Sequence, residues 1–152
     1  MAGYLRLVRD LTDGPGEAPR WPQGVTLAPF NATLAPAAHA LLVECYCDGY
    51  GSVPVAFDTW WATTRHDPEF DASLCFCAMH DGRLVGFALC WTSAFIKDFV
   101  VAPEGRRQGL GAAMLQHILA AFRARGAGEV ALKVVEENAA ALRLYHRLGF
   151  RQ

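Results

Sequence analysis

The sequence predicts a single domain of the α/β (α+β) class, in which helices pack on the faces of one sheet. Three observations support this prediction. The chain has 152 residues, the length of one ordinary domain. Its composition, 53% hydrophobic and 19% charged residues, is too apolar for a disordered chain. Strand-like and helix-like patterns follow one another in the order β-β-α-α-β-β-β-α-β-α. We therefore expect one domain over residues 1–152, which opens with a strand and a linker rich in proline and glycine over residues 1–24.

The first half of the chain contains two strand patterns followed by two helix patterns. Apolar residues alternate over residues 4–11 and again over residues 25–30. Residues 34–47 repeat their apolar positions at helical spacing, and residues 53–65, which include two tryptophans, form the second helical pattern. The glycine-containing segment 48–52 separates these two helices.

The second half begins with a hairpin. Strand-like runs at residues 74–79 and 84–91 are joined by a turn that contains Asp-Gly, the favoured pair for a tight turn. Residues 95–101 form a further strand, which is apolar on both faces except at two positions, as expected of a central strand. The remaining patterns are a helix at 110–125, a buried strand at 129–135 and a helix at 138–148 that Asn138 caps.

The charge distribution limits the classes of partner. The net charge of −1 gives no reason to expect nucleic acid. Residues 104–152 hold eight basic and four acidic residues, whereas residues 1–103 hold six and eleven. The basic part suits a phosphorylated ligand, although an accident of surface composition explains the imbalance equally well. No apolar run approaches the roughly 20 residues of a membrane span, and no signal-peptide core is present. We therefore expect no membrane partner and a cytoplasmic location.

The five cysteines indicate neither a disulfide framework nor a metal site. Their number is odd, and no secretion signal accompanies them. Cys75 and Cys77 lie in an apolar strand pattern, where cysteine behaves as a small hydrophobic residue. The Cys-x-x-Cys spacing of structural zinc sites is missing. We expect no metal.

The segment 99–112 joins a strand to the longest helix through a basic, glycine-rich turn. The first amides of a helix have no partner within the helix and carry the positive end of its dipole, so they bind anions. Gly109 and Gly111 leave room for a pyrophosphate beside the backbone. Helix-to-strand packing would explain the same glycines. The P-loop sequence and the complete dinucleotide fingerprint are absent, and a generic nucleotide-binding domain stays an alternative.

Two motifs resemble the GNAT superfamily of acyl-CoA-dependent N-acetyltransferases. The first is Val-Ala-Pro at 101–103 followed by Arg-Arg-Gln-Gly-Leu-Gly at 106–111. The second begins at Asn138 and places Tyr145 seven residues later. The resemblance covers roughly residues 74–150. It implies a mixed, mostly antiparallel sheet with a splayed parallel strand pair and with helices on both faces.

The resemblance also implies a binding site for acetyl-CoA. The strands at 95–101 and 129–135 would separate, leaving backbone groups of the first strand free to pair with the pantetheine arm. The amides of residues 107–112 would hold the pyrophosphate, and Arg143 could help the cradle arginines to bind the 3′-phosphate. The cofactor-binding residues expected on this basis are Phe99, Val100, Val101, Arg106, Arg107, Gln108, Gly109, Leu110, Gly111, Ala112, Asn138 and Tyr145.

Two residues are the expected catalytic groups. Tyr145 would lie near the thioester sulfur and protonate the leaving thiolate as a general acid. Asp98, in the strand beside the thioester, is the first candidate for the base that takes protons from the amine. Each residue also has a purely structural explanation. Tyr145 would then be an aromatic residue of the core, and Asp98 a solvated or salt-bridged acid at the end of its strand. The weaker candidates for the base are Glu44, Asp48 and His146, and the candidate walls of the acceptor pocket are Tyr46, Tyr50, Trp60 and Trp61.

The sequence departs from the family pattern in two ways. Members that act on protein amino termini often carry an acid where this chain has Lys133, which argues against a ribosomal protein as substrate. Most members continue with further strands after the motif that ends here at Phe150, so the strand at 129–135 would be a bare sheet edge. We expect the strand at 4–11 to cover this edge, within the chain or from the second subunit of a homodimer. The stretch that runs from an Arg-x-Leu to Trp-Pro-Gln-Gly-Val-Thr-Leu at 21–27 also resembles the beginning of one half of the two-domain mycothiol synthases.

The function expected from these residues is transfer of the acetyl group of acetyl-CoA to a primary amine by direct attack in a ternary complex. The amine could belong to a small molecule or to a peptide, and the sequence does not identify it. The alternative is a non-catalytic acyl-CoA-binding module, a sensor or a partner domain with the same fold.

Overall fold

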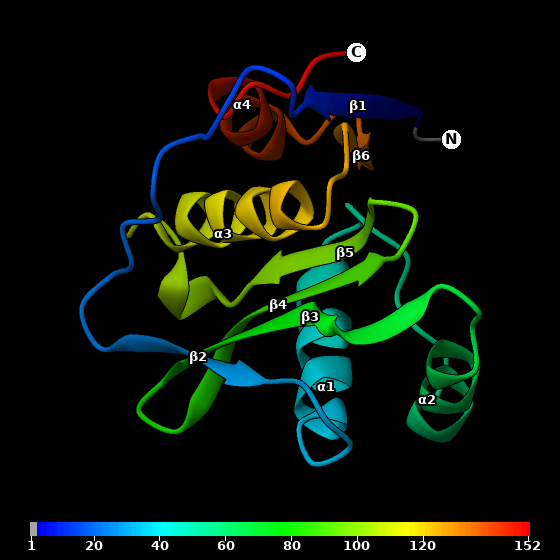
Figure 1. Cartoon of the computed structure of the whole chain (residues 1–152). Helices are drawn as coiled ribbons and strands as arrows, with labels where there is room; N and C mark the ends of the chain where they lie inside the picture. The colour runs from blue at the N-terminus through cyan, green and yellow to red at the C-terminus, as the bar shows by residue number, and fades with distance from the viewer. Residues whose placement is uncertain (1–2) are drawn as a thin grey trace.

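The computed structural model describes residues 3–152, which form a six-stranded sheet with helices on both faces. The strand order is β1-β6-β5-β4-β3-β2, and all neighbours are antiparallel except β5 and β6. Figure 1 shows α3 packed on one face of the sheet and α1 on the other. The elements are β1 (Tyr4–Asp10), β2 (Val25–Pro29), α1 (Ala35–Tyr46), α2 (Phe57–Arg65), β3 (Phe70–His80), β4 (Arg83–Trp91), β5 (Phe95–Val101), a 3-10 turn η1 (Pro103–Gly105), α3 (Leu110–Ala124), β6 (Glu129–Val135) and α4 (Ala139–Arg147).

The predicted fold class is confirmed, and two predicted boundaries are wrong. Helix α2 begins four residues later than expected, because Ala56 is extended and His39 Nε2 donates to the carbonyl of Val55, 2.7 Å away. Strand β3 begins four residues earlier than expected, at Phe70, which pairs with Trp91. A bulge follows that pair, and its polar residues interrupt the alternation on which the sequence prediction depended.

Helix α3 joins the sheet to the region where the candidate site lies. Its apolar stripe is buried, and Met114, Leu115 and Ile118 are at most 1% exposed. Glycine at position 86 of β4 allows the close approach, because a Cβ there would lie 2.5 Å from the sulfur of Met114. The helix therefore packs closely against the strands, and this packing positions its N-terminus at the candidate site.

Strands β5 and β6 separate after a short contact. Both strands have seven residues, yet only Phe95–Ala131 and Ile96–Leu132 are paired. Lys97 follows at a bulge in the β4–β5 ladder, a feature that bends a strand and re-aims its side chains. The splayed parallel pair that the resemblance implied is confirmed.

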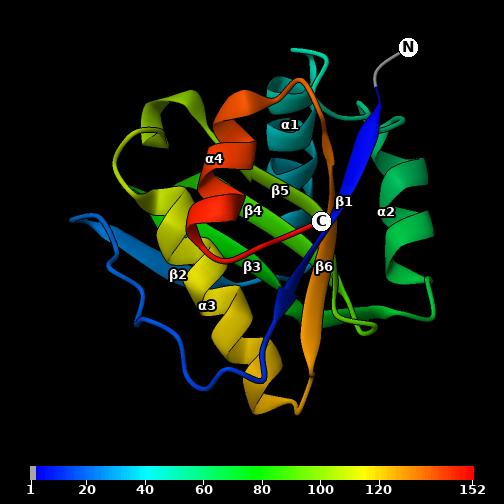
Figure 2. The same cartoon turned by 90° about the horizontal axis from the view of Figure 1, so that it is seen from above.

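Strand β1 covers the outer edge of β6. The two strands pair antiparallel over their full length, from Tyr4–Val135 to Asp10–Glu129, and Figure 2 shows them side by side. Leu7 of β1 is completely buried. The prediction that this strand covers the edge is confirmed, and the covering strand comes from the same chain. Within residues 3–152 no helix has the length and hydropathy needed to cross a membrane.

Candidate active site

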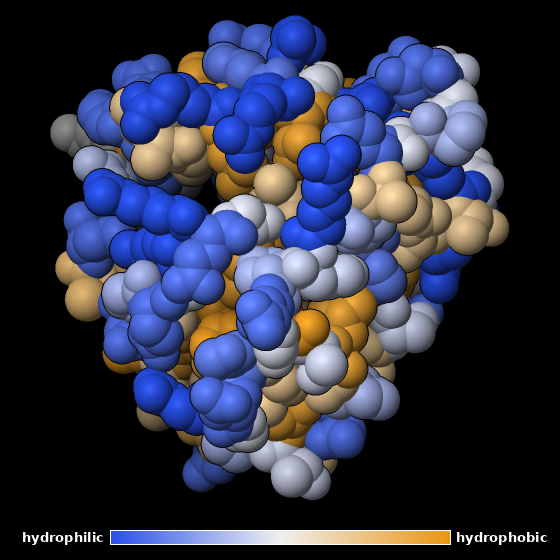
Figure 3. Space-filling view, turned by 90° about the vertical axis from the view of Figure 1, so that its left-hand side faces the viewer, coloured by the Kyte–Doolittle hydropathy of each residue, from blue (hydrophilic) through white to orange (hydrophobic). Residues whose placement is uncertain are grey.

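A cleft of about 570 Å³ opens where β5 and β6 separate. Residues of β5, β6, α4 and the start of α3 line it, together with the end of α1. Figure 3 looks onto the side of the molecule where α3 begins, where hydrophilic residues surround apolar patches. Eleven of the twelve predicted binding residues line the cleft. The exception is Gln108, whose Nε2 donates to the carbonyl of Glu104, 3.0 Å away.

The turn before α3 presents a run of free backbone donors. Within residues 3–152, none of the amides from Arg107 to Ala112 donates to a protein acceptor, and the first helical bond runs from Ala113 N to Gly109 O. Arg107 and Gly109 are both left-handed, with φ of 62° and 83°. Turns that mix left-handed residues into the backbone form anion-binding concavities. The dipole of α3 adds positive potential at the same place, so the geometry is that of an anion receptor.

The two glycines of this turn have different structural reasons. A Cβ at Gly109 would meet nothing within 4 Å, so glycine is favoured there by its left-handed backbone. A Cβ at Gly111 would lie 3.2 Å from Leu144, so glycine there lets α4 pack on α3. These contacts explain both glycines without reference to a ligand.

At the end of β5, one backbone group that was expected to be unpaired has a hydrogen-bond partner. The carbonyl of Val101 is not free, because Arg106 Nε donates to it at 3.0 Å and the thiol of Cys45 lies 3.6 Å away. The expectation of an unpaired carbonyl is wrong at this position, and the Arg106 guanidinium folds back on the strand. On α4, Arg147 lines the cleft and Arg143, one helical turn earlier, does not.

Helix α4 supplies two of the predicted residues. Asn138 caps the helix as predicted, since its Oδ1 accepts from the amide of Ala141 at 3.2 Å. Tyr145 is 7% exposed, and its ring lies against Phe99 and Phe150, with centroid separations of 6.3 and 5.7 Å. Burial raises the pKa of the Tyr145 phenol, so the group stays protonated at neutral pH. A neutral hydroxyl donor therefore borders the cleft.

Asp98 reaches the cleft only through another residue. It is 8% exposed and is not among the lining residues. Its Oδ1 accepts from the hydroxyl of Tyr46 at 2.9 Å, and Tyr46 lines the cleft. Burial, together with the neighbouring Asp98 carboxylate, raises the pKa of Tyr46. Tyr46 and Asp98 thus form a hydrogen-bonded pair with the phenol on the cleft side.

The other candidates divide into two groups. Asp48 and Tyr50 line the cleft, whereas Glu44 and His146 do not. The predicted acceptor walls Trp60 and Trp61 are not lining residues either, and pack instead in an aromatic cluster. Sequence reasoning assigned no binding role to the other polar lining residues, which are Cys45, Lys97, Lys133 and Arg147.

The cysteines are free thiols. In the part of the chain that the structure describes, no three His, Cys, Asp or Glu side chains gather as metal ligands. Burial raises the pKa of Cys75 and of Cys77 to about 12. Both thiols are protonated at neutral pH and pack as apolar groups in β3.

Comparison with curated proteins finds three kinds of relative. The chain is 35% identical to the mycothiol acetyltransferase of Thermobispora bispora, over 95% of the chain and 52% of that protein. It is 41% identical to the streptothricin acetyltransferase of Streptomyces lavendulae, over 46% of the chain and 40% of that protein. It is 32% identical to the [ribosomal protein bS18]-alanine N-acetyltransferase of Escherichia coli, over 61% of the chain and 65% of that protein. The chain thus spans about half the length of the curated relatives it matches.

The solved structures that this chain resembles include further N-acetyltransferases. A GCN5-related N-acetyltransferase from Sphaerobacter thermophilus superposes with a TM-score of 0.82 at 26% identity, over 97% of this chain and 47% of that one. The ribosomal-protein-S18-alanine N-acetyltransferase of Escherichia coli superposes with a TM-score of 0.67 at 26% identity, over 84% and 78% of the two chains.

A family description also matches most of the chain. The matched segment, residues 35–150, contains the cleft, the anion receptor and both motifs. With the splayed strands and the relatives above, this match shows that the chain belongs to the acetyltransferase (GNAT) family.

Proposed function

We propose that this protein is an N-acetyltransferase that moves the acetyl group of acetyl-CoA to a primary amine by direct attack in a ternary complex. The observation that carries the proposal is the run of free amides from Arg107 to Ala112, which borders the same cleft as Tyr145. A diphosphate needs several donors in a row, and a thioester next to an amine needs a proton donor for the leaving sulfur. Both features are present along one continuous surface.

Acetyl-CoA fits the residues of this cleft. The amides of the receptor would hold the pyrophosphate, while Arg107 and Arg147 would make charge-assisted contacts to phosphate oxygens. The pantetheine arm would lie between the separated strands, where the edge of β5 and the side chain of Asn138 can pair with its amides. Bound acetyl-CoA supplies an activated acyl group, and the cleft supplies its orientation.

Residues of this chain would carry out the proton transfers of the reaction. The amine nitrogen attacks the thioester carbonyl and loses a proton, which passes to Tyr46 as Tyr46 gives its own hydroxyl proton to Asp98. Tyr145 donates its proton to the departing sulfur, and free CoA thiol and an N-acetylated amine result. Asp98 then acts as the base through Tyr46, without touching the substrate.

The acceptor amine is not identified by these comparisons. The matched relatives are named for a small thiol, an antibiotic and a ribosomal protein. Lys133, which lines the cleft where the family's enzymes for protein amino termini often carry an acid, favours a small-molecule acceptor. The cytoplasmic location and the homodimer expected from the sequence stay predictions.

The test is a panel of primary amines supplied with acetyl-CoA, with release of free thiol as the readout. Turnover of one or more amines, and its loss in Tyr145→Phe with unchanged CoA affinity, supports the proposal. Binding of CoA without turnover of any amine would instead favour the non-catalytic acyl-CoA-binding module.

A further inference from the structure

Three cations occupy adjacent strands at the point where the sheet opens. Arg6 of β1 is the register partner of Lys133 in β6. Lys133 and Lys97 each follow the last β5–β6 pair, Ile96–Leu132. Register partners project from the same face of a sheet, which holds for Arg6 and Lys133. Among the described residues Lys97 has no register partner, and it is related to Lys133 because both residues line the cleft. We call Lys97, Lys133 and Arg6 the basic row.

Acidic side chains of the protein neutralise only part of the positive charge of the basic row. Like charges at neighbouring positions of a sheet repel one another. Lys97 Nζ lies 3.7 Å from Asp98 Oδ2. In residues 3–152, neither Lys133 nor Arg6 forms an ion pair within 4.0 Å. Both side chains belong to exposed residues. The row therefore keeps a net positive charge, carried by Lys133 and Arg6.

Two acidic residues near Arg6 lie outside the main cleft. Glu69 and Glu129 line a second hollow that also contains Arg6. Neither acid lines the main cleft, whereas Lys97 and Lys133 both do. The negative charge near Arg6 therefore lies outside the cleft, and within the basic row the charge that lines the cleft without an ion pair is that of Lys133.

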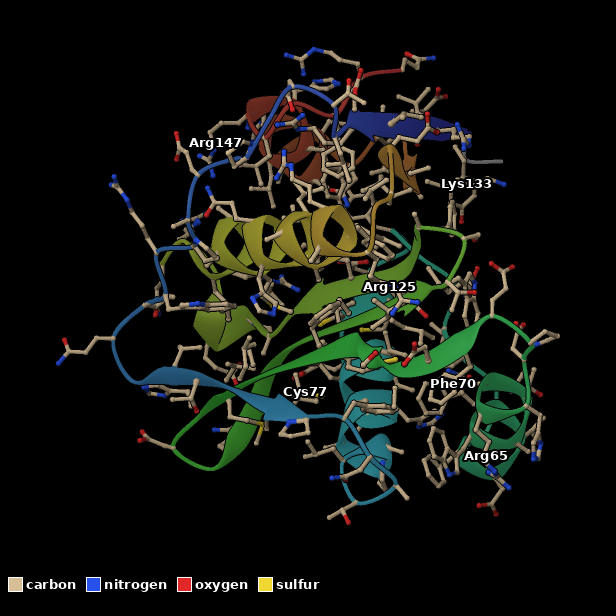
Figure 4. All side chains as sticks on the ribbon, viewed as in Figure 1. Arg65, Phe70, Cys77, Arg125, Lys133 and Arg147 are labelled. Carbon is tan, nitrogen blue, oxygen red and sulfur yellow. The ribbon has the colours of Figure 1, made fainter. Side chains whose placement is uncertain are left out.

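The row lies apart from the part of the cleft that suits phosphates. Figure 4 shows Lys133 of β6 and Arg147 of α4 on opposite sides of the view, although both residues line the cleft. Arg147 lines the cleft together with Arg106 and Arg107, which precede α3. Lys97 precedes Phe99 by two residues, about 7 Å along the strand, and the Phe99 ring contacts Tyr145. A small molecule with its amine at Tyr145 and Tyr46 would thus place a substituent a few bonds away beside the row.

From this arrangement, and on the basis of the proposed acetyl transfer, we propose that Lys133, assisted by Lys97, binds a carboxylate of the acceptor. The acceptor is then an amine that carries a carboxylate within a few bonds, an amino acid or a compound that ends in one. A singly charged group matches the site, because Asp98 already offsets one of the two lysines that line the cleft. The same placement puts the amine end of the acceptor beside Tyr46, whose hydroxyl donates to Asp98.

The experiment compares amines that differ only in this charge. Amino acids and their amides, β-alanine and β-alaninamide among them, are assayed as matched pairs with acetyl-CoA, with ethanolamine phosphate as a dianionic comparison. We expect kcat/KM to be about tenfold or more higher for the carboxylates, the size of one charge-assisted contact. Equal use of acid and amide, or preference for the phosphate or for cationic amines, would overturn the proposal.

Variants then locate the effect. Lys133→Gln should raise KM about tenfold for the carboxylate member of a pair and leave the amide member unchanged, and Lys133→Arg should restore most of the difference. Arg83→Gln is the matched control, because it removes the same charge from an exposed residue outside the cleft. A loss that Lys133→Gln inflicts equally on acid and amide would mean that this lysine is structural.

A binding measurement separates this inference from the proposed function. N-acetylglycine and N-acetylglycinamide are titrated into the CoA-loaded protein while the backbone amide signals of Lys97 and Lys133 are followed by NMR. We expect these signals to shift with the acid only, and less in Lys133→Gln. If CoA itself does not bind, the proposed function fails, and the same titration of the free protein still decides the carboxylate site. Identical responses to the acid and the amide would refute it.

Discussion

Tyr145 combines burial with access to the cleft, which makes it the most informative single side chain. Replacement by phenylalanine keeps the ring contacts with Phe99 and Phe150 and removes only the hydroxyl. We expect kcat to fall about 100-fold or more, the usual contribution of a general acid, while the Kd for CoA changes less than threefold. Thiol release and calorimetry measure the two quantities. Tyr4→Phe, which removes a hydroxyl from an exposed residue of β1, is the control.

The pH profile tests the same hydroxyl from another direction. Burial raises the pKa of Tyr145 above its ordinary value of 10. A raised pKa means that the phenol keeps its proton as the pH rises. At pH values up to about 10, ionisation of Tyr145 should therefore not reduce kcat. A fall in kcat near pH 8 that disappears in Tyr145→Phe would show that the phenol ionises far too easily for this environment.

The Tyr46–Asp98 pair makes a prediction about additivity. If Asp98 acts only through Tyr46, then Tyr46→Phe, Asp98→Asn and the double variant should lower kcat by similar factors, because each breaks the same relay. Single effects that multiply in the double variant would show that the two residues act independently. A large loss in Asp98→Asn with full activity in Tyr46→Phe would mean that Asp98 meets the amine directly.

The positions of these side chains in the fold could be predicted for some residues and not for others. Tyr145 and Asn138 could be placed because both belong to one local motif, whose helical spacing fixes their relative positions. The hydrogen bond between Tyr46 and Asp98 could not be predicted, because the two residues are 52 positions apart and meet only when α1 packs on β5. The packing of Trp60 and Trp61 away from the cleft likewise depends on tertiary contacts.

Helix α3 offers a test of the anion receptor with an internal control. Gly109 and Gly126 flank this helix, both have φ of 83°, and a Cβ at either position meets nothing within 4 Å. Alanine at each should therefore impose a similar strain of about 1–2 kcal/mol. Only Gly109→Ala should weaken CoA binding, because only Gly109 belongs to the receptor. Equal CoA affinities of the two variants would argue against a role of this turn in binding.

Strand β1 should contribute much of the stability of the sheet edge. Leu7 is completely buried, so Leu7→Ala should lower the free energy of unfolding by about 3 kcal/mol in a denaturant titration. Leu27→Ala on the opposite edge strand, where the side chain is 37% exposed, should cost less than about 1 kcal/mol. Deletion of residues 1–22 should be strongly destabilising. Unchanged thermal stability of the deletion variant would contradict the role of β1.

The elements themselves were predictable where the hydrophobic pattern was clean. Strands β5 and β6 have the bounds expected from the sequence, because their near-continuous apolar runs end at charged or proline-containing segments. The start of β3 was missed because a bulge and polar residues interrupt its pattern. The start of α2 was missed because a tertiary hydrogen bond from His39 fixes the preceding segment.

For the molecule as a whole, the order of the strands was the least predictable property. Periodicity shows that strands exist but does not say which strands are neighbours. The parallel contact between β5 and β6 and their separation followed from the family resemblance, not from the pattern. The place of β1 could be inferred from the edge that β6 would otherwise leave bare.

The most direct test of the account is calorimetric titration of the purified protein with CoA and with acetyl-CoA. The free amides at the start of α3 predict one binding site for each ligand, with the affinity reduced in Gly109→Ala and retained in Gly126→Ala. ATP and NAD, which lack the pantetheine arm, should bind far more weakly. The absence of any heat of binding for both CoA and acetyl-CoA would contradict the account.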